Sequence, residues 1–487
     1  MTKTRKPLII NAFDMGTSGL QSPGLWKHPD DQSAKKDLDY WINLAKLLEK
    51  GKFNSVFLAD VLGGYDVYNG PRNLKAAINS GAQWPVYEPS LFVPVMAAVT
   101  KNLTFGVTFS TVSEAPYHFT RRLATLDQLT NGRVGWNVVS SYLDSASRNT
   151  LNGADLPAHA ERYERAEEYL QVVYKLFLSS WSDDAVKLDK ESGIFTDHEK
   201  VREINHEGKF FKVPGPNIVS PTPQRLPVIL QAGSSPSGKD FAARNAEIVF
   251  LTTFTPESLA GKIEEIKKIA KEKYGREEGS IKFLQLVTTV IGKTHEEAAE
   301  KYRHFKSFGD KEGASALFSG WTGINIGQFD PDQELRDVGS NAIRGVVENW
   351  TKEAPGDPPN LKKTRNYVAD QITVGGLGPV LYGTKEEVAD EIERWVDVSQ
   401  VDGFNFTYAI TPGTFEELVN ELIPELRKRG LAWEDYPEEG LTFREQVFGT
   451  EGEDPSFVDP THPAYKLRWR AGVSKEDFEA SLNETTT

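Results

Sequence analysis

The sequence predicts an α/β protein built as a (β/α)8 barrel. Short apolar runs alternate with longer amphipathic stretches nearly from end to end, which is typical of parallel strands covered by helices. Eight such runs can be distinguished, and eight strands with helices between them fit a closed barrel better than an open, doubly wound sheet. The chain has 487 residues, which is long enough for one barrel with insertions. The open sheet stays the alternative.

The predicted strands are short apolar runs. They cover residues 7–13, 55–60, 103–110, 134–141, 227–233, 248–253, 282–292 and 403–410. In the third run, apolar residues alternate with small or polar ones, so Thr108 and Ser110 share one face. A barrel would turn this face inward and leave room at its mouth for a ligand. An exposed edge strand would show the same alternation.

The predicted helices fill the segments between the strands with amphipathic patterns. They include residues 39–50, 116–130, 159–177, 237–247, 256–275, 295–307 and 413–430. We therefore predict one barrel domain, residues 1–430. The tail, residues 431–487, is rich in Glu, Pro and Thr with little periodicity, which predicts a C-terminal surface extension.

Three segments exceed ordinary connection lengths and are predicted as insertions, at about 61–100, 182–226 and 308–380. The first and third follow strands two and seven, and loops after strands lie on the catalytic face of a barrel. We expect these two to fold over the mouth as a lid. The second follows a helix and should lie away from the chemistry. The two lid segments carry aromatic residues that could seal a cavity: Tyr65, Tyr68, Trp84, Phe318 and Trp321.

The composition excludes several classes of function. Lys and Arg number 56 and Asp and Glu number 70, so the net charge is −14, which argues against general affinity for nucleic acid or anionic membranes. The absence of Cys excludes disulfides and thiolate chemistry. The apolar run at the N-terminus is too short for a secretion signal or a membrane span, so we expect a cytoplasmic protein.

The clearest local motif is QAGSSPSGKDFAARNAE, residues 231–247. A strand ends at Gly233, two serines follow, and a helix begins. The hydroxyls of Ser234 and Ser235, together with the free N–H groups of the helix, predict a cradle for an anion such as phosphate. An ordinary capped helix after a tight turn explains the motif equally well.

Four other residues are candidates for ligand contact. His159 and Tyr163 lie four residues apart and share one face of a helix, although Tyr163 also begins an apolar stripe. Asp60 ends a predicted strand, and Asn137 interrupts an apolar one. Turn capping and backbone hydrogen bonds are the alternatives for this second pair.

Other catalytic patterns find no support. The His residues lack the HExxH spacing, so we predict no metal site. Neither GxSxG nor GxGxxG occurs. Paired carboxylates of a barrel glycosidase stay possible, since acidic residues are abundant.

Four motifs in order carry a family resemblance: SVFLAD, TFSTVSEAPYHFTRRLATLDQLTNGRVGWNVVSSYLDSASRN, HAERYERAEEY and QAGSSPSGKDFAARNAEIVF. The chain resembles the bacterial luciferase-like flavin monooxygenases, in the branch of nitrilotriacetate monooxygenase, over most of residues 7–430. The resemblance implies a TIM barrel that binds reduced FMN (FMNH2) and reacts with O2. A flavin C4a-hydroperoxide would then oxygenate a small organic substrate. It also implies a separate NAD(P)H:flavin reductase as the FMNH2 source.

The same resemblance assigns roles to individual residues. It implies that Asp60, Thr108 and Asn137 surround the isoalloxazine ring, with Ser110 as the alternative to Thr108. It implies a second set near the ribityl chain and phosphate: His159, Tyr163, Ser234 and Ser235.

The resemblance leaves the substrate and any acid or base residue open. It implies a homo-oligomer, a dimer or a tetramer. A deazaflavin-dependent oxidoreductase on the same barrel, or a noncatalytic flavin-binding protein, is the alternative function.

Overall fold

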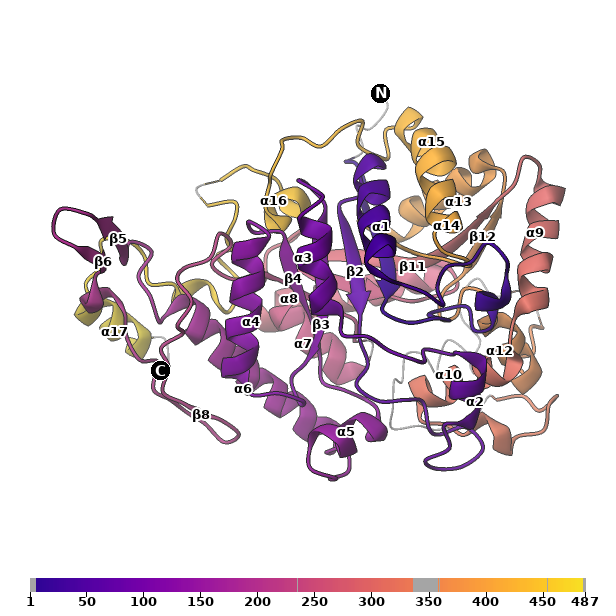
Figure 1. Ribbon diagram of the computed structural model, residues 1–487, viewed down its shortest axis with the longest axis horizontal. Coiled ribbons are helices and arrows are strands. Elements are labelled where there is room, and N and C mark those ends of the chain that lie inside the picture. Colours follow the sequence, from indigo (N-terminus) through magenta and orange to yellow (C-terminus); the bar gives the residue numbers. More distant parts are fainter. Residues whose placement is uncertain (1–5, 234, 336–357, 359, 453, 485–487) are drawn as a thin grey trace.

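The computed structural model contains a closed parallel barrel (Figure 1). It describes residues 6–233, 235–335, 358, 360–452 and 454–484. All eight predicted strands are confirmed, with small shifts at their ends. The barrel strands are β1 (Ile9–Met15), β2 (Ser55–Ala59), β3 (Thr104–Ser110), β4 (Val134–Val139), β9 (Val228–Gln231), β10 (Ile248–Leu251), β11 (Lys282–Ile291) and β13 (Gly403–Thr407).

Strand pairing decides between the barrel and the open sheet. β1 pairs with both β2 and β13, β13 pairs with β11, and β11 pairs with β10. These pairings close the ring, so the open sheet is wrong. A short edge strand, β12 (Val380–Gly383), adds to the last residues of β11.

Helices cover the outside of the barrel, and polar N-caps start several of them, such as Asp37 before α1 and Thr384 before α13. The N-terminal half holds α1 (Leu38–Lys50), α2 (Lys75–Ser80), α3 (Phe92–Ala97), α4 (Pro116–Leu129), α5 (Asp144–Thr150), α6 (His159–Leu178) and α7 (Pro236–Asn245). The rest are α8 (Pro256–Tyr274), α9 (His295–Phe308), α10 (Lys311–Thr322), α12 (Arg365–Ile372), α13 (Lys385–Ser399), α14 (Gly413–Glu417), α15 (Ile423–Lys428), α16 (Phe443–Phe448) and α17 (Lys475–Glu484).

The inward face of β3 is the small, polar face, as predicted. Thr108 lines the cavity inside the barrel mouth, whereas Phe105 and Val107 are buried in the surrounding core. A Cβ at position 106 would lie 3.2 Å from a methyl group of Leu230, so this glycine lets the leucine fill the interior closely. The interior therefore has room at the mouth and is filled by side chains lower down.

The first and third insertions meet over the mouth. Helix α2 packs against α10, and residues from both insertions share a small apolar core with residues of α5. We call residues 61–86 together with residues 311–335 the cap. In Figure 1 the cap helices α2 and α10 lie at the lower right, next to α12. The remaining part of the third insertion includes residues 336–357 and 359, which lie outside the described residues.

The second insertion points away from the barrel. It forms two small hairpins, β5 (Val186–Asp189) with β6 (Ile194–Thr196), and β7 (His206–Glu207) with β8 (Lys212–Val213). The first hairpin extends at the left edge of Figure 1. None of its described residues lines the cavity at the mouth, which agrees with the prediction for this segment.

The predicted surface extension does not lie wholly on the surface, because some of its described residues pack into the barrel. Phe443, Arg444 and Trp469 are almost fully buried. The ring of Phe443 packs against Gly135 of β4, where a Cβ would lie 2.9 Å from it. Figure 1 shows α16 at the opposite end of the strands from the cap. The segment therefore closes the N-terminal end of the barrel.

Candidate functional site

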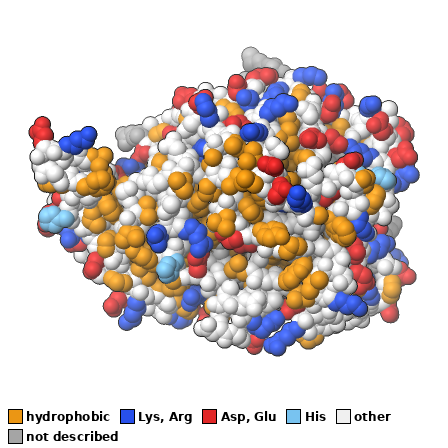
Figure 2. Space-filling view, in the orientation of Figure 1, with side chains coloured by type: hydrophobic (Ala, Val, Ile, Leu, Met, Phe, Trp, Pro, Cys, Tyr) orange, Lys and Arg blue, Asp and Glu red, His pale blue; other side chains and the backbone are white. Residues whose placement is uncertain are grey.

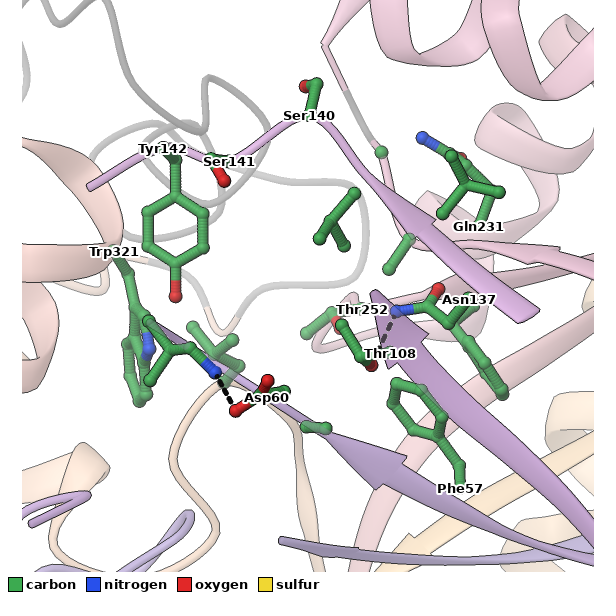
Figure 3. Close-up of a pocket in the computed structure, with 18 of the residues that line it drawn as sticks. Phe57, Asp60, Thr108, Asn137, Ser140, Ser141, Tyr142, Gln231, Thr252 and Trp321 are labelled. Atoms are coloured by element: carbon green, nitrogen blue, oxygen red, sulfur yellow. Dashed lines mark hydrogen bonds between the residues drawn. The ribbon is translucent and has the colours of Figure 1, made fainter. Parts of the chain in front are cut away.

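A cavity of about 260 Å³ opens at the carboxyl ends of the barrel strands. Its floor is aromatic: the ring centroids of Phe13 and Phe57 lie 5.0 Å apart, and those of Phe57 and Phe250 lie 4.4 Å apart. Figure 3 shows Tyr142, Trp321 and Asp60 on one side of this space. Asn137, Thr108, Gln231 and Thr252 lie on the other side.

One end of the cavity is suited to an anion. His159 and Tyr163 project from the first turns of α6, and the His159 Nε2 lies 3.4 Å from the Ser235 hydroxyl. Ser235 is the N-cap of α7 and accepts a hydrogen bond from the Gly238 N–H at 3.0 Å. Free N–H groups and a positive dipole end therefore meet a histidine and a hydroxyl.

Arg162 adds a buried cation to the same end. Its Nη1 donates to the Pro157 carbonyl at 2.7 Å, whereas its Nε has no partner among the described residues. Burial lowers the pKa of this guanidinium below its ordinary value. A buried charge with an unsatisfied donor is stabilised by an anionic ligand, so Arg162 fits a phosphate group beside Ser235.

The middle of the cavity presents unpaired acceptors. The Asn137 Nδ2 donates to the Thr108 hydroxyl at 2.9 Å, which leaves the buried Asn137 Oδ1 without a partner. The Oε1 of Gln231 is also buried and unpaired among the described residues. The flavin ring has an N–H donor between two carbonyl groups, so these acceptors fit its polar edge. Ser110 instead bonds to Ser141 at 2.7 Å, which favours Thr108 as the cavity residue.

Asp60 lies at the end of β2 and is the only Asp or Glu among the described residues that line the cavity. Its Oδ1 accepts a hydrogen bond from the Val61 N–H at 2.8 Å. Burial raises the pKa of Asp60 to about 7, and the negative charge of Glu88 adds to the shift. Because a second carboxylate is missing from this wall, the cavity does not have the carboxylate pair of a barrel glycosidase.

A hydrogen-bonded group joins the two halves of the cap at the cavity wall. The Tyr65 hydroxyl donates to the Gln83 Oε1 at 2.8 Å and accepts from the Trp321 Nε1 at 3.1 Å. The Tyr142 hydroxyl lies 2.8 Å from the Tyr65 hydroxyl. Burial raises the pKa of Tyr142 to about 12 and holds that of Tyr65 well above its ordinary value. All four side chains are therefore neutral at physiological pH.

The structure brings most of the predicted site residues into one cavity. Its lining includes six of the seven: Asp60, Thr108, Asn137, His159, Tyr163 and Ser235. Ser234, the seventh, lies outside the described residues. Whether these residues hold a flavin stays a prediction.

The sequence analysis missed three residues of the cavity wall. Arg162, Gln231 and Tyr142 all line it. Arg162 lies between His159 and Tyr163 on α6, and that spacing is the only signal that could have found it. Gln231 and Tyr142 follow strand ends, where side chains of a barrel reach the mouth.

Two of the five aromatic residues that were predicted to seal a cavity lie on its wall. Tyr65 and Trp321 line the cavity. Tyr68 and Phe318 instead pack inside the core of the cap, and Trp84 is 36% exposed. These three do not line the cavity, because cap segments need an apolar core of their own before they can cover a ligand.

The described residues contain neither a candidate metal site nor a candidate membrane span. Among the residues that the structure describes, no group of three or more His, Cys, Asp or Glu side chains could hold a metal ion. In the same part of the chain, no helix is both long and apolar enough to cross a membrane. Figure 2 shows acidic and basic side chains mixed over the visible face, without a continuous basic stripe there.

Comparison with known proteins identifies relatives along nearly the whole chain. The luciferase-like monooxygenase model matches residues 24–399. The chain is 47% identical over 474 residues to the dimethyl-sulfide monooxygenase of Hyphomicrobium sulfonivorans, covering 97% of this chain and 96% of that protein. It is 44% identical to the long-chain alkane monooxygenase of Geobacillus thermodenitrificans, covering 91% and 94%. Component A of the nitrilotriacetate monooxygenase of Aminobacter aminovorans is 34% identical, covering 88% and 94%, and is a more distant relative.

Solved structures give the same result for the fold. The crystal structure of DmoA from Hyphomicrobium sulfonivorans superimposes with a TM-score of 0.87 at 46% identity, covering 97% of this chain and 98% of that one. A riboflavin lyase, RcaE, solved with a modified FMN and riboflavin, has a TM-score of 0.86 at 33% identity, covering 95% and 100%.

Proposed function

Because this chain belongs to the luciferase-like monooxygenase family, we propose that it takes up reduced FMN and uses O2 to oxygenate a small organic substrate. The family is that of flavin-dependent monooxygenases, so the enzyme class follows from membership. We propose further that the flavin is FMN, that it binds in its reduced state and that a reductase supplies it.

The observation that carries the proposal is the uneven distribution of polar groups along the cavity. Cationic and N–H groups gather at one end, around Arg162, His159 and Ser235. The Asn137 Oδ1, an acceptor that is unpaired among the described residues, lies beside Thr108 of the neighbouring strand. A mononucleotide flavin has its phosphate at one end and its polar ring at the other, so it matches this order.

Each group of residues has one task in this proposal. His159, Tyr163, Arg162 and Ser235 bind and orient the phosphate. Asn137 accepts a hydrogen bond from the ring and is itself held by Thr108. When bound, reduced FMN supplies the two electrons with which O2 is activated.

The cap excludes water from the reaction. Tyr65 and Trp321 close the wall beside the ring position through their mutual hydrogen bond. A dry site limits the competing release of H2O2, because water and protons no longer reach the reacting atoms freely.

We also propose that a separate reductase supplies the reduced flavin. One relative is named as component A of its monooxygenase, which points to a second component. No GxGxxG dinucleotide motif occurs in this sequence, which supports the same division of labour.

Anaerobic calorimetry tests the proposal. Photoreduced FMN should bind more tightly than oxidised FMN, because a two-component enzyme captures the reduced form from solution. Admission of O2 should then oxidise the bound flavin. A reduced deazaflavin cofactor serves as the control ligand. Tighter binding of the deazaflavin, or equal binding of the two FMN forms, would contradict the proposal.

A further inference from the structure

The positive charge of the cavity is confined to its phosphate end. Among the described residues that line the cavity, Arg162 is the only Lys or Arg and His159 is the only His. Both come from the start of α6, beside Ser235. In the proposed function, the cofactor phosphate occupies this end. A second anion in the cavity would therefore find no cation.

Hydrogen-bond directions at the opposite end are fixed by the indole of Trp321. An indole N–H can only donate, so Tyr65 accepts from it. The Gln83 amide is oriented by its own donation to the Leu20 carbonyl at 2.7 Å, so its Oε1 accepts the Tyr65 proton. The Tyr142 hydroxyl must then donate to Tyr65, since both hydroxyls cannot share one proton.

Tyr142 and Asp60 consequently present electron pairs to the cavity. With its proton directed to Tyr65, the Tyr142 oxygen keeps only acceptor capacity. The Asp60 carboxyl interacts electrostatically with Tyr142, and its Oδ1 is already bonded to the Val61 N–H. The Tyr142 oxygen therefore offers an incoming carboxylate or sulfonate no hydrogen bond, and Asp60 offers it no positive charge.

The surface between these groups is apolar. Met15, Leu20, Val61, Leu286 and Leu377 line it, together with the aromatic floor. An ionised group placed against such a surface loses its hydration without gaining a counter-ion, whereas an apolar group gains from leaving water.

We infer that the substrate is an uncharged, largely apolar molecule, and that the cavity rejects anions because, beyond its phosphate end, the described residues of its lining offer them no cation. The inference rests on the proposed function, since it takes the phosphate end as occupied by FMN. It separates this chain from any enzyme that oxygenates polycarboxylates on the same barrel.

Three thioethers that share a methylthio group and differ in the group at the other end test the inference: methyl propyl sulfide, 3-(methylthio)propanoate and 3-(methylthio)propylamine. Each contains the same oxidisable sulfur. One oxygen atom of O2 would be transferred to sulfur to give the sulfoxide. The other would leave as water, with two electrons and two protons from reduced FMN.

Binding is measured first, by quenching of tryptophan fluorescence in the anaerobic complex with reduced FMN, because Trp321 lines the cavity. The neutral sulfide should bind at least tenfold more tightly than the propanoate. It should also bind more tightly than the amine, because Asp60 offsets only part of the hydration that an ammonium group loses on the apolar wall. After admission of O2, the neutral sulfide should lower the yield of H2O2 per flavin oxidised more than either charged probe. Binding of the propanoate within tenfold of the neutral sulfide, or tighter binding of the amine than of the neutral sulfide, would overturn the inference.

A charge variant with a matched control sharpens the test. Val61→Arg adds a cation to the cavity wall, and Leu62→Arg adds the same charge to the next residue, which is 39% exposed and does not line the cavity. Val61→Arg should reduce the preference for the neutral sulfide over the propanoate by tenfold or more, and Leu62→Arg should not. An equal preference in both variants would count against the inference.

The two failures can be told apart. If reduced FMN does not bind, or O2 does not oxidise it, the proposed function fails. If reduced FMN binds and is oxidised while the propanoate binds as well as the sulfide, only the substrate class is wrong.

Discussion

Ser235 caps a helix and also faces the cavity. Its hydroxyl caps α7 through the Gly238 N–H and also faces the cavity beside His159. We expect Ser235→Ala to weaken FMN binding by about 1.5–3 kcal/mol, the usual value of a hydrogen bond to a charged group. Riboflavin, which lacks the phosphate, should bind almost as before. Calorimetry with both ligands measures the difference.

Thr255 provides the control for the lost cap. It caps α8 by accepting from the Ser258 N–H at 3.3 Å, and it does not line the cavity. Thr255→Ala and Ser235→Ala should both cost about 1 kcal/mol of unfolding free energy. Only Ser235→Ala should affect FMN. A similar loss of riboflavin affinity would show that Ser235 does not contact the phosphate.

Asp60 predicts a pH dependence of stability. Burial raises its pKa from 3.8 to about 7, so the folded chain holds this proton more tightly than the unfolded chain. Stability falls with pH wherever the folded state binds more protons. The contribution of Asp60 to the free energy of unfolding should therefore decrease from pH 4 to pH 7 and stay constant above that range.

Urea unfolding at pH 5 and pH 8 measures this effect. Asp60→Asn removes the titration. The free energy of unfolding of the variant minus that of the natural chain should therefore be larger at pH 8 than at pH 5. Asp155→Asn changes an exposed side chain that does not line the cavity and serves as the control. An identical pH response of both variants would contradict the prediction.

At the scale of elements, the cap depends on a few bridging hydroxyls. Tyr65→Phe removes the acceptor of Trp321 and the donor to Gln83, which leaves buried polar groups unpaired. We expect a loss of about 1–3 kcal/mol in stability. The yield of H2O2 per flavin oxidised should rise, because the wall of the cavity loosens. Peroxide assays under single turnover measure this yield.

Tyr68 supplies the matched variant. It is equally buried in the cap and donates to Glu312 at 3.0 Å, but it does not line the cavity. Tyr68→Phe should lower stability and leave the H2O2 yield unchanged. If both variants raise the yield alike, the cap seals the site only through its overall stability.

The elements of the barrel were predictable and those of the cap were not. Barrel strands are buried and apolar, and the helices between them show one polar face, so their periodicity is clear. Helix α10 is different, because residues 313–322 are buried on every side. The local signals for this helix were its N-cap Asp310 and the Gly323 that follows its last residue, and the prediction used neither of them.

The residues of the site also differ in whether the sequence could predict them. Ser235 and Asn137 were predictable because a capping motif and an interrupted strand are local signals. Arg162 was not predicted, because α6 also carries Arg165. Only the position of Arg162 between His159 and Tyr163 separates the arginine that lines the cavity from the one that packs over Phe211. Burial in the folded barrel decides between them.

At the scale of the whole molecule, a buried ion pair fastens the C-terminal segment to the barrel. Arg444 donates to Glu247 at 2.6 and 2.9 Å and to the Leu226 carbonyl at 2.9 Å. Burial alone would raise the pKa of Glu247. The positive charge and hydrogen bonds of Arg444 have the opposite effect and hold this pKa below its ordinary value. Composition predicted a surface tail because its few buried residues are scattered among polar ones.

We expect Arg444→Ala to destabilise the protein by about 3–5 kcal/mol, since it leaves a buried carboxylate without its partner. Arg394 makes half-exposed ion pairs with Glu257 and Glu391, so Arg394→Ala should cost less than about 1 kcal/mol. Urea unfolding measures both. FMN affinity of the folded Arg444→Ala protein should be unchanged, because the pair lies at the far end of the barrel. Equal destabilisation by the two variants would contradict this role.

Glu247 and Arg444 lie 197 positions apart in the chain, so the ribosome synthesises Glu247 long before its ion-pair partner. When β10 is synthesised, the cation that allows Glu247 to be buried does not yet exist. We therefore expect the carboxylate to stay in water, and this end of the nascent barrel to stay open, until α16 emerges. Stalled chains that end before residue 443 should be cut by protease near Glu247, whereas chains released at full length should resist it. Completion of the barrel is thus a late step that follows the translation of its own closing segment.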